Sequence, residues 1–416
     1  MRILQVAGSA TGGVARHVEQ VATELADAGQ DVRIAAPRAV RERIAVPGVE
    51  LDLRDRPSAA DARTVETLRT LAAGADVVHA HGLRAGALTV LAVRSLRARP
   101  RVVVTEHNLA VGSRRTLAIS GVLERLVARG ADVVLAVAPD LAERARRLGA
   151  RDVRLAVVPA PPRRPATAGR EEVRASLSIP DGVALVICVS RLAPQKGLDL
   201  LVEAAALTER TLAGRAAPGG DRTPHDPSPH AAAPYDAAPH VAAPHVAAPH
   251  VAAPHVAAPH DPSPHDPTPR PAGPATAWCV AGSGPLRAEL AEHAASIGAP
   301  VRLLGAREDV PDLLAAADVV VSTSHWDGQT IVLQEAMVAG AAVVATDVGG
   351  VSIVTGEAGI LTGRDAREVS DAVVQILTDV GLSRRLKAAA LRRSSDLATG
   401  ADLAAQLRDV YGPTER

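Results

Sequence analysis

Two cations, Arg191 and Lys196, flank a short loop in the segment SRLAPQKG. An apolar run precedes this loop and a helical pattern follows it, so we expect it at the carboxyl end of a strand and the start of a helix. Anions bind at such places because backbone N–H groups and the helix dipole favour negative charge. The chain has 44 Arg and only two Lys, which favours a special task for the compact ammonium group of Lys196. We predict a diphosphate site here; the alternative is a chance Lys on a solvated turn.

A second segment whose side chains could bind a ligand is SHWDGQT, residues 324–330, which runs into a helix carrying Glu335. Asp327 lies in the loop, and the helix start points at it. Two carboxylates in this arrangement can accept hydrogen bonds from sugar hydroxyls, Gly328 leaves room for a ligand, and Trp326 could form a wall of the pocket. The alternative is an acidic residue that stabilises the helix dipole, together with a solvated Glu.

Glycine pairs follow two predicted strands, at Gly12 and Gly13 and at Gly349 and Gly350. Glycine lets the backbone approach a phosphate or a sugar closely, and a following helix start favours an anion. The first pair lacks the G-x-G-x-x-G spacing of dinucleotide-binding proteins, which counts against a dehydrogenase. These turns are therefore candidate donor-binding sites.

Histidines also stand at strand ends, at His79, His81 and His107. A single histidine is more often structural than functional, and His107 is the best functional candidate of the three. Cys188 and Cys279 lie inside apolar runs and are typical of small core residues. Because no Asp-x-Asp stands at a strand end and two cations can neutralise a diphosphate, we expect neither a cofactor nor a metal site.

Short apolar runs alternate with amphipathic helical stretches along nearly the whole chain, a pattern typical of a doubly wound parallel sheet. The first series of strands ends before a proline-rich stretch, and a second series follows it. The predicted strands are residues 3–7, 32–36, 77–79, 102–105, 133–137 and 155–158 in the first series, and 185–189, 277–281, 301–304, 319–322 and 342–346 in the second.

These two series predict two Rossmann-like domains that face a cleft. We expect a first domain at residues 1–160, a linker at 161–182, a second domain at 183–395, and a C-terminal helix at 396–416 that packs back towards the first domain. Residues 213–274 are rich in Pro, Ala and His and repeat APHVA. Regular proline blocks helices and sheet ladders, so we predict a disordered insertion. A histidine-rich metal-binding tract is the less favoured alternative.

Charge is unevenly distributed although the formal net charge is zero. Residues 1–160 contain 24 Arg against 17 Asp plus Glu, and the remainder contains 22 basic and 29 acidic residues. The basic half could face an anionic acceptor or membrane; the alternative is a scattered, solvated Arg surface. Few aromatic residues argue against nucleic acid binding. Since no apolar run reaches the ~18 residues of a membrane span, we expect a cytoplasmic protein, at most peripheral to the inner face of the plasma membrane.

Taken together, these motifs resemble those of the retaining GT-B glycosyltransferases of family 4, over nearly the whole chain outside the insertion. The resemblance implies that the domain at residues 1–160 binds the acceptor and the domain at 183–395 binds the nucleotide sugar. The resemblance implies that Gly12 and Gly13 open the first helix beside the donor and that Arg191 and Lys196 hold the donor diphosphate. The turn AGSGP, which contains Gly284, is similar to the family's glycine-rich turn after the next strand.

The family's signature of two Glu separated by seven residues corresponds here to Asp327 and Glu335. The resemblance implies that Asp327 contacts the hydroxyls of the transferred sugar, Glu335 the ribose, and His107 the region near the donor sugar. Asp in place of the first Glu leaves the donor's identity open. The family's Asn-Gly after the linker strand and its Pro-Glu after Gly349 and Gly350 are also absent.

The function implied is retaining transfer from a UDP-, GDP- or ADP-sugar to a hydroxyl acceptor, without a metal, in cell-envelope glycan, glycolipid or small-thiol or inositol glycoside synthesis. In this scheme the two cations stabilise the leaving diphosphate, whose oxygen takes the acceptor's proton. The alternatives are a nucleotide-sugar epimerase of the same fold and a binding or scaffold protein without turnover. The sequence leaves the acceptor open.

Overall fold

The computed structural model describes residues 1–8, 12–53, 58–109, 113–160, 165–216 and 275–412. The first residues of the predicted loop at 9–13, part of the predicted linker, and all but the start of the predicted insertion lie outside the described residues. Residues 213–216, which we assigned to the insertion, form the last turn of a helix, so that boundary was placed too early.

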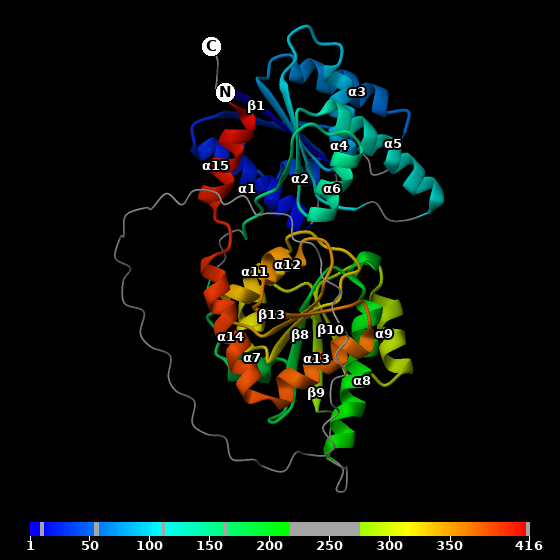
Figure 1. The fold of residues 1–416 in the computed structure, drawn as a ribbon, viewed down its shortest axis with the longest axis vertical. Helices are drawn as coiled ribbons and strands as arrows, with labels where there is room; N and C mark the ends of the chain where they lie inside the picture. Colours follow the sequence, from blue (N-terminus) through cyan, green and yellow to red (C-terminus); the bar gives the residue numbers. More distant parts are fainter. Residues whose placement is uncertain (9–11, 54–57, 110–112, 161–164, 217–274, 413–416) are drawn as a thin grey trace, which may run out of the picture.

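The N-terminal domain is built on a parallel sheet in the order β3-β2-β1-β4-β5-β6-β7 (Figure 1). Most connections between its strands are helical. The elements are β1 (Arg2–Ala7), α1 (Gly13–Asp27), β2 (Asp31–Ala36), α2 (Arg38–Arg41), β3 (Gly48–Glu50), α3 (Asp61–Ala72), β4 (Val77–His81), α4 (Leu83–Val93), β5 (Arg101–Glu106), α5 (Arg114–Gly130), β6 (Val133–Ala136), α6 (Pro139–Arg147) and β7 (Val153–Leu155).

The C-terminal domain repeats this plan with a parallel sheet in the order β10-β9-β8-β11-β12-β13. Its elements are α7 (Arg170–Ser176), β8 (Ala184–Val189), the short 3-10 helix η1 (Pro194–Lys196), α8 (Leu198–Ala216), β9 (Thr276–Ala281), α9 (Arg287–Ser296), β10 (Val301–Gly305), α10 (Val310–Ala316), β11 (Val319–Ser322), α11 (Ile331–Val338), β12 (Val343–Thr346), α12 (Val351–Thr355), β13 (Gly359–Thr362), α13 (Ala366–Thr378) and α14 (Val380–Ser395).

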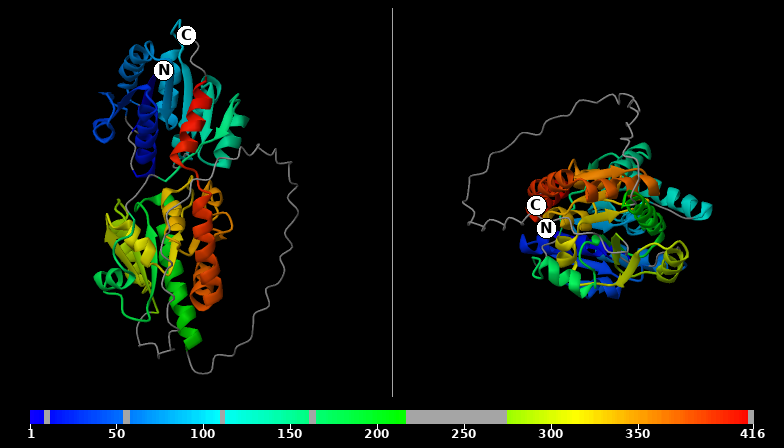
Figure 2. Two further views of the ribbon diagram at one scale, coloured as in Figure 1. Left: turned by 90° about the vertical axis from the view of Figure 1, so that its left-hand side faces the viewer. Right: turned by 90° about the horizontal axis from the view of Figure 1, so that it is seen from below.

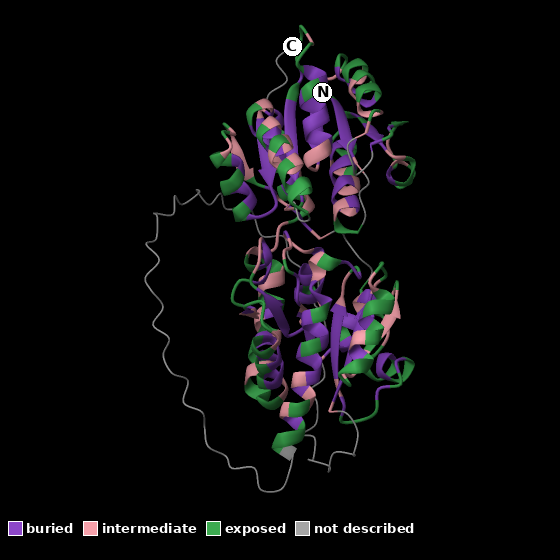
Figure 3. Cartoon of the chain, turned by 90° about the vertical axis from the view of Figure 1, so that its right-hand side faces the viewer, coloured by how far each residue is buried: buried purple, intermediate pink, exposed green. Residues whose placement is uncertain are grey.

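Both sheets have helices on their two faces, so their central strands are buried on both sides and consist of continuous apolar runs. In Figure 3 the strands form buried layers, while the outer faces of the helices are exposed. The prediction of two doubly wound parallel sheets is confirmed. The strand expected at 155–158 instead spans Val153–Leu155.

The sequence missed two strands, β3 and β13, and both lie at sheet edges. β3 is only three residues long and fully exposed, and β13 is only partly buried. An edge strand with one neighbour and a glycine at its start lacks the long apolar run that identifies a buried central strand. Their absence from the prediction therefore follows from their weak hydrophobic signal.

The last helix, α15 (Gly400–Tyr411), follows the C-terminal domain in sequence but lies beside the strands of the N-terminal domain (Figures 1 and 2). Its apolar face, formed by Leu403, Leu407, Val410 and Tyr411, belongs to the same core cluster as residues of β1, β4 and β5. The chain thus crosses between the domains a second time.

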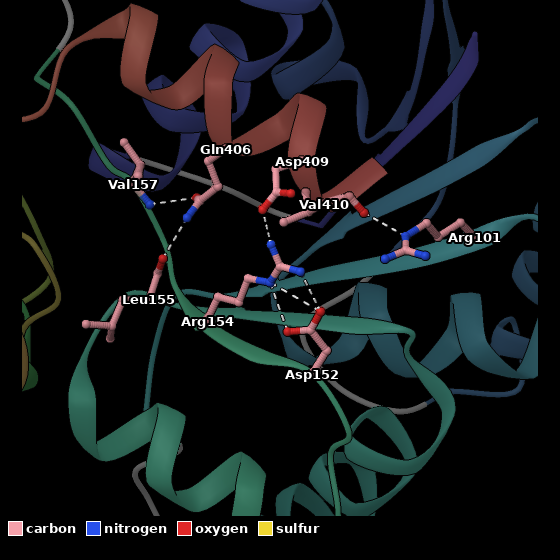
Figure 4. A network of polar contacts seen from close by, with 8 residues as sticks. All are labelled: Arg101, Asp152, Arg154, Leu155, Val157, Gln406, Asp409 and Val410. Carbon is pink, nitrogen blue, oxygen red and sulfur yellow. Dashed lines mark hydrogen bonds and ion pairs between the residues drawn. The ribbon is translucent and has the colours of Figure 1, made fainter. Parts of the chain in front are cut away.

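A polar network fixes α15 in place (Figure 4). The side chain of Gln406 accepts a hydrogen bond from the backbone N–H of Val157 (2.8 Å) and donates to the carbonyl of Leu155 (2.8 Å). Arg154 contacts both Asp152 and Asp409. Because these contacts join α15 to β7 and the segment after it, the C-terminal helix is an integral part of the N-terminal domain.

Candidate functional site

A cavity of about 690 Å³ lies between the two domains. Its walls come from loops at the carboxyl ends of the strands: those after β1, β5 and β6 in the first domain, and those after β8, β9, β10 and β11 in the second. This is the place where doubly wound sheets bind ligands. Of the residues proposed from the sequence, Arg191, Lys196, Asp327 and His107 all line the cavity.

The two segments with the strongest sequence signal meet in one ion pair. The ammonium of Lys196 lies 2.5 Å from Oδ2 of Asp327, and the hydroxyl of Ser324 donates to the same oxygen at 3.2 Å. Both charged side chains are largely buried. Asp327 is therefore held in one orientation by a cation and a hydroxyl donor.

Close packing brings these two loops together at Gly197. This residue has a positive φ of 54°, and a Cβ there would lie 2.2 Å from the carbonyl oxygen of Thr323. The backbone N–H of His325 also donates to the carbonyl of Gln195 at 2.9 Å. Only glycine fits, so the sequence Lys-Gly places Lys196 against the loop that carries Asp327.

Arg191 comes from the end of β8 and lies near the start of α1 in the other domain. A Cβ on Gly12 would stand 3.7 Å from Cδ of Arg191, and one on Gly13 would stand 3.6 Å from Ile331 at the start of α11. Gly12 and Gly13 both line the cavity. The positive ends of α1 and α11 thus approach the cavity together with Arg191 and Lys196, an arrangement that suits a bound anion.

Glu335, which we predicted to contact the donor ribose, is not among the residues that line the cavity. It is buried on α11, and its Oε1 lies 3.4 Å from Nη1 of Arg16. Arg16, one turn into α1 of the opposite domain, does line the cavity. The sequence analysis missed Arg16; its only signal was a cation shortly after the glycine pair, on the first turn of a helix.

The remaining candidate glycines differ in what they touch. Gly328 lines the cavity, and a Cβ there would lie 2.7 Å from the side chain of Val137 in the other domain. Gly349 and Gly284 do not line the cavity: added Cβ atoms would lie 2.0 Å from the carbonyl of Asp327 and 2.2 Å from that of Leu192.

Gly350 does not line the cavity either. A Cβ there would meet the backbone of Gly328 and the carbonyl of Val137 at 3.0 and 2.8 Å. The backbones of Gly284, Gly349 and Gly350 thus pack closely against neighbouring loops of the site, whereas Gly282 and Ser283 in the turn after β9 line the cavity.

The loops of the C-terminal domain are joined to the N-terminal domain by three polar side chains. Trp326 Nε1 donates to a carboxylate oxygen of Asp140 at 2.7 Å. Gln329 donates to the carbonyl of Ala156 at 2.6 Å, and Gln334 donates to that of Val158 at 2.8 Å. These bonds come from the same segment as Asp327, so the position of this residue depends on how the domains meet.

Three buried histidines cluster on the first domain's side of the site: His17 of α1, His81 of β4, and His107 just after β5. Of these, His17 and His107 line the cavity. One ring nitrogen from each of the three lies within 4.8 Å of the others, and His81 Nδ1 lies 3.4 Å from His107 Nε2. Burial lowers the pKa of His17 to about 4 and holds the pKa values of His81 and His107 well below 6.5, with neighbouring histidines adding to the effect for those two. All three are thus neutral near pH 7.

Within the described part of the chain, these three residues are the one group of histidine, cysteine and carboxylate side chains placed to hold a metal ion. The ring of His79 lies beside that of His81, with centroids 4.3 Å apart, but its two nitrogens are bonded to Tyr411 (2.8 Å) and Thr105 (2.7 Å). The sequence analysis named His79, His81 and His107 but missed His17, which is one of the buried positions on α1.

Cys188 lines the cavity at the end of β8. Burial raises the pKa of its thiol to about 12, against an opposing effect of Lys196. The reactive form of cysteine is the thiolate, so Cys188 is not suited to act as a nucleophile at neutral pH. Cys279 is buried in the core of the second domain.

Comparison with protein families matches both domains. Residues 12–161 match the family described as "Glycosyl transferase 4-like domain", and residues 269–379 match "Glycosyl transferases group 1". None of the helices among the described residues is both long and apolar enough to pass through a membrane.

Two curated relatives carry the name D-inositol 3-phosphate glycosyltransferase. The protein from Gordonia bronchialis is 34% identical over 225 residues, which span 47% of this chain and 49% of the relative. The protein from Nocardia farcinica is 29% identical over 414 residues, which span 90% of this chain and 79% of the relative. The chain thus spans about half the length of the first relative and most of the second.

Among solved structures, HepE from Anabaena in complex with UDP and glucose has a similar fold, with a TM-score of 0.70. It is 18% identical, and the match covers 98% of each chain. The likeness supports a common two-domain architecture along the full length.

Proposed function

Because the chain belongs to the group 1 glycosyltransferases, we propose that it transfers a sugar, with retention of anomeric configuration, from a nucleotide-diphosphate sugar to a hydroxyl acceptor. The observation that carries this proposal is the convergence of Arg191, Lys196 and Asp327 on one cavity beside two helix starts. Two cations and two positive helix ends suit a diphosphate, and a carboxylate beside them suits sugar hydroxyls.

The proposed chemistry is substitution at the anomeric carbon. The bond between this carbon and the diphosphate oxygen breaks, the acceptor oxygen bonds to the same face, and the acceptor's proton passes to the departing phosphate oxygen. Arg191 and Lys196 stabilise the negative charge that develops on the leaving group. Since Lys196 pairs with Asp327, donor binding exchanges a carboxylate for a phosphate on the ammonium.

That exchange also gives Asp327 its role. Once Lys196 turns to the diphosphate, the carboxylate of Asp327 is available to the hydroxyls of the transferred sugar, while Ser324 still holds it in place. Closure of the two domains around the cavity excludes water and limits donor hydrolysis. His107 lies on the opposite wall as a neutral group, where its ring can contact the sugar without adding charge.

For the donor, we propose a UDP-, GDP- or ADP-sugar and favour UDP, because the neighbouring structure of HepE holds UDP. For the acceptor, we propose a hydroxyl compound bound by the N-terminal domain, in the synthesis of an envelope glycan, a glycolipid or an inositol or small-thiol glycoside. The relatives named D-inositol 3-phosphate glycosyltransferase support an inositol phosphate as the first acceptor to assay.

We further propose that the enzyme works in the cytoplasm without a metal and that its basic N-terminal domain touches an anionic membrane. Arg191 and Lys196 together supply the charge that a metal would bring to a diphosphate. Turnover in the presence of EDTA should therefore equal turnover without it. Activity that disappears on chelation and returns with added Mg²⁺ or Mn²⁺ would refute metal independence, and a return with Zn²⁺ alone would point to His17, His81 and His107.

The test of the proposed function is a donor panel. The purified chain is incubated with UDP-, GDP- and ADP-sugars, with and without inositol phosphate, and nucleoside diphosphate release is followed together with the identity of the sugar products. Release from one nucleotide class supports the proposal. Tight donor binding without release in any acceptor mixture would instead support a binding protein, and an altered sugar nucleotide would support an epimerase.

A further inference from the structure

Helix α5 (Arg114–Gly130) carries a stripe of cationic and aliphatic residues on its solvent-facing side. The stripe consists of residues separated by three or four positions, which places them on one face of the helix. All of its members are exposed: Arg114, Ala118, Val122, Arg125 and Arg129. Solvent-facing helix surfaces normally mix both signs of charge, whereas this face is cationic and aliphatic.

The start of α5 extends the same surface. Residues 113–118 are all exposed, so Arg115 adds a further cation beside Arg114, and Leu117 is 46% exposed on this first turn. Val122, one turn further, is 64% exposed, among the highest values for a large apolar side chain in the described residues. Figure 1 shows α5 on the outside of the N-terminal domain, with one end standing clear of the other helices.

The charge of this face is not neutralised by neighbouring acids. Glu124, the sole acidic residue of α5, points inward, is buried, and is bonded to Arg144 at 2.6 Å. No ion pair within the described residues involves Arg114, Arg125 or Arg129. The arginines therefore remain available to anions from outside the molecule.

We propose that the outward face of α5 docks on an anionic lipid bilayer. Arginine side chains can bind lipid phosphates while their aliphatic stems, with Leu117 and Val122, enter the boundary between headgroups and acyl chains. Exposed aliphatic side chains between the cations favour a bilayer over a purely charged partner such as nucleic acid, which would need no apolar contact. This inference locates the membrane contact proposed above but does not depend on sugar transfer.

Helix α14 (Val380–Ser395) has a similar exposed face but lies in a part of the chain with a different net charge. It also carries exposed aliphatic side chains, Val380 and Leu391, and exposed arginines, Arg384 and Arg385. However, α14 lies in the part of the chain with more acidic than basic residues, and Asp379 caps its start. α5 lies in the part with 24 Arg against 17 acidic residues, which adds attraction to an anionic surface. We therefore expect docking through α5 and none through α14.

The position of α5 links docking to the cavity. The chain runs from β5 through His107, which lines the cavity, and enters α5 at Arg114. The exposed first turn of α5 therefore follows the cavity wall closely in sequence. A bilayer in contact with this turn would bring a lipid-borne acceptor towards the N-terminal side of the cavity.

The test is co-sedimentation of the full chain with vesicles of phosphatidylcholine alone and of phosphatidylcholine mixed with phosphatidylglycerol, without donor or acceptor. The parent should bind the mixed vesicles, not the neutral ones, and should release them at high salt. The double substitution R114E and R115E should weaken binding at least about tenfold. Val122→Ser should weaken it by about two- to fourfold, and Leu391→Ser on α14 should leave it unchanged.

Several results would overturn the proposal. They are equal binding to neutral vesicles, unaltered binding of the R114E and R115E variant, equal loss in the Leu391→Ser control, or full binding of Val122→Ser. Should the charge-reversed variant fail to fold, Val122→Cys labelled with a polarity-sensitive dye gives a second measurement, because the native cysteines are buried. Its emission should shift to the blue with mixed vesicles, and an unchanged spectrum would refute insertion. Because no donor is present, neither result depends on the proposed transfer.

Discussion

The two domains share one architecture but present opposite kinds of surface to the cavity. The C-terminal side offers charged side chains, Arg191, Lys196 and Asp327, the last two joined in an ion pair. The N-terminal side offers neutral imidazoles, His17 and His107, kept uncharged by burial. A strongly charged diphosphate needs the first kind of wall, whereas a neutral sugar or acceptor hydroxyl can be held by the second.

This contrast explains why the C-terminal wall of the cavity could be recognised in the sequence and the N-terminal wall could not. Charged residues at strand ends are rare and stand out, especially a lysine in a chain that otherwise uses arginine. Neutral histidines resemble the structural histidines found in many cores. Most of the charged side chains named at the cavity therefore come from the C-terminal domain, with Arg16 of α1 as an exception.

The largest effect is expected for Lys196→Ala. Its charge strengthens contact with the leaving group as negative charge develops, so the substitution should lower kcat by about 10²–10³-fold with a smaller effect on donor KM. Lys196→Arg should also be impaired, since a planar guanidinium fits poorly in the tight loop before Gly197. The measurement is steady-state donor turnover. A variant that keeps more than about a tenth of parental kcat would place the diphosphate elsewhere.

A smaller, more selective effect is expected for Asp327→Ala. Loss of a charged hydrogen-bond acceptor for the sugar should lower kcat/KM by roughly 10- to 100-fold. Free nucleoside diphosphate should bind at least as tightly as before, because Lys196 no longer has a carboxylate partner. Calorimetric titration with nucleoside diphosphate and with nucleotide sugar separates the two effects, and Asp327→Glu serves as the charge-conserving control. Equal losses for both ligands would contradict a sugar-specific role.

Arg16→Ala tests the one charged contact that the N-terminal domain makes at the cavity through α1. Removing the partner of Glu335 should lower kcat/KM by about tenfold or less, because the pair is only partly buried. Arg16→Lys should restore part of the activity. If Arg16→Ala lowered kcat as strongly as Lys196→Ala, the division of charge between the domains would be wrong.

The smallest effect is a change in the pH dependence of stability in His17→Leu. His17 has a folded pKa of about 4, below its unfolded value of about 6.5, so the unfolded state takes up more protons between these values. The parent should therefore lose stability as pH falls from about 6.5 towards 4, and the variant should lose less. Melting temperatures at pH 7 and pH 5 for both proteins give the comparison. Parallel curves would show that His17 does not titrate on unfolding.

Glu106 acts in the opposite direction in the same pH range. Burial, with the nearby charge of Glu124, raises its pKa to about 7, so its contribution to stability is greatest at low pH and is lost as pH rises through that value. Both proteins contain Glu106, so the difference between them isolates His17.

The sequence predicted the two parallel sheets because their central strands are continuous apolar runs separated by helical patterns. It did not predict β3 or β13, whose edge positions leave them short and partly exposed. The lysine loop and the aspartate loop were each identified from residue type and position. Their direct contact was not, because Lys196 and Asp327 are 131 residues apart and only the folded sheet brings them together.

The same limit explains Arg16, His17 and Glu335. Arg16 reaches the other domain, so its contact with Glu335 depends on how the domains meet. His17 occupies an ordinary buried position of an amphipathic helix. It becomes a candidate ligand only because the fold places His81 and His107 next to it. Contacts between domains and between neutral groups leave no local pattern in the sequence.

The central claim is that the C-terminal domain holds the donor diphosphate between Arg191 and Lys196. A crystal structure with bound nucleoside diphosphate tests it most directly. The account predicts phosphate oxygens within about 3.2 Å of both side chains, with the ammonium of Lys196 turned from Asp327 to the phosphate. A diphosphate bound elsewhere, or one bound while Lys196 remains paired with Asp327, would contradict it.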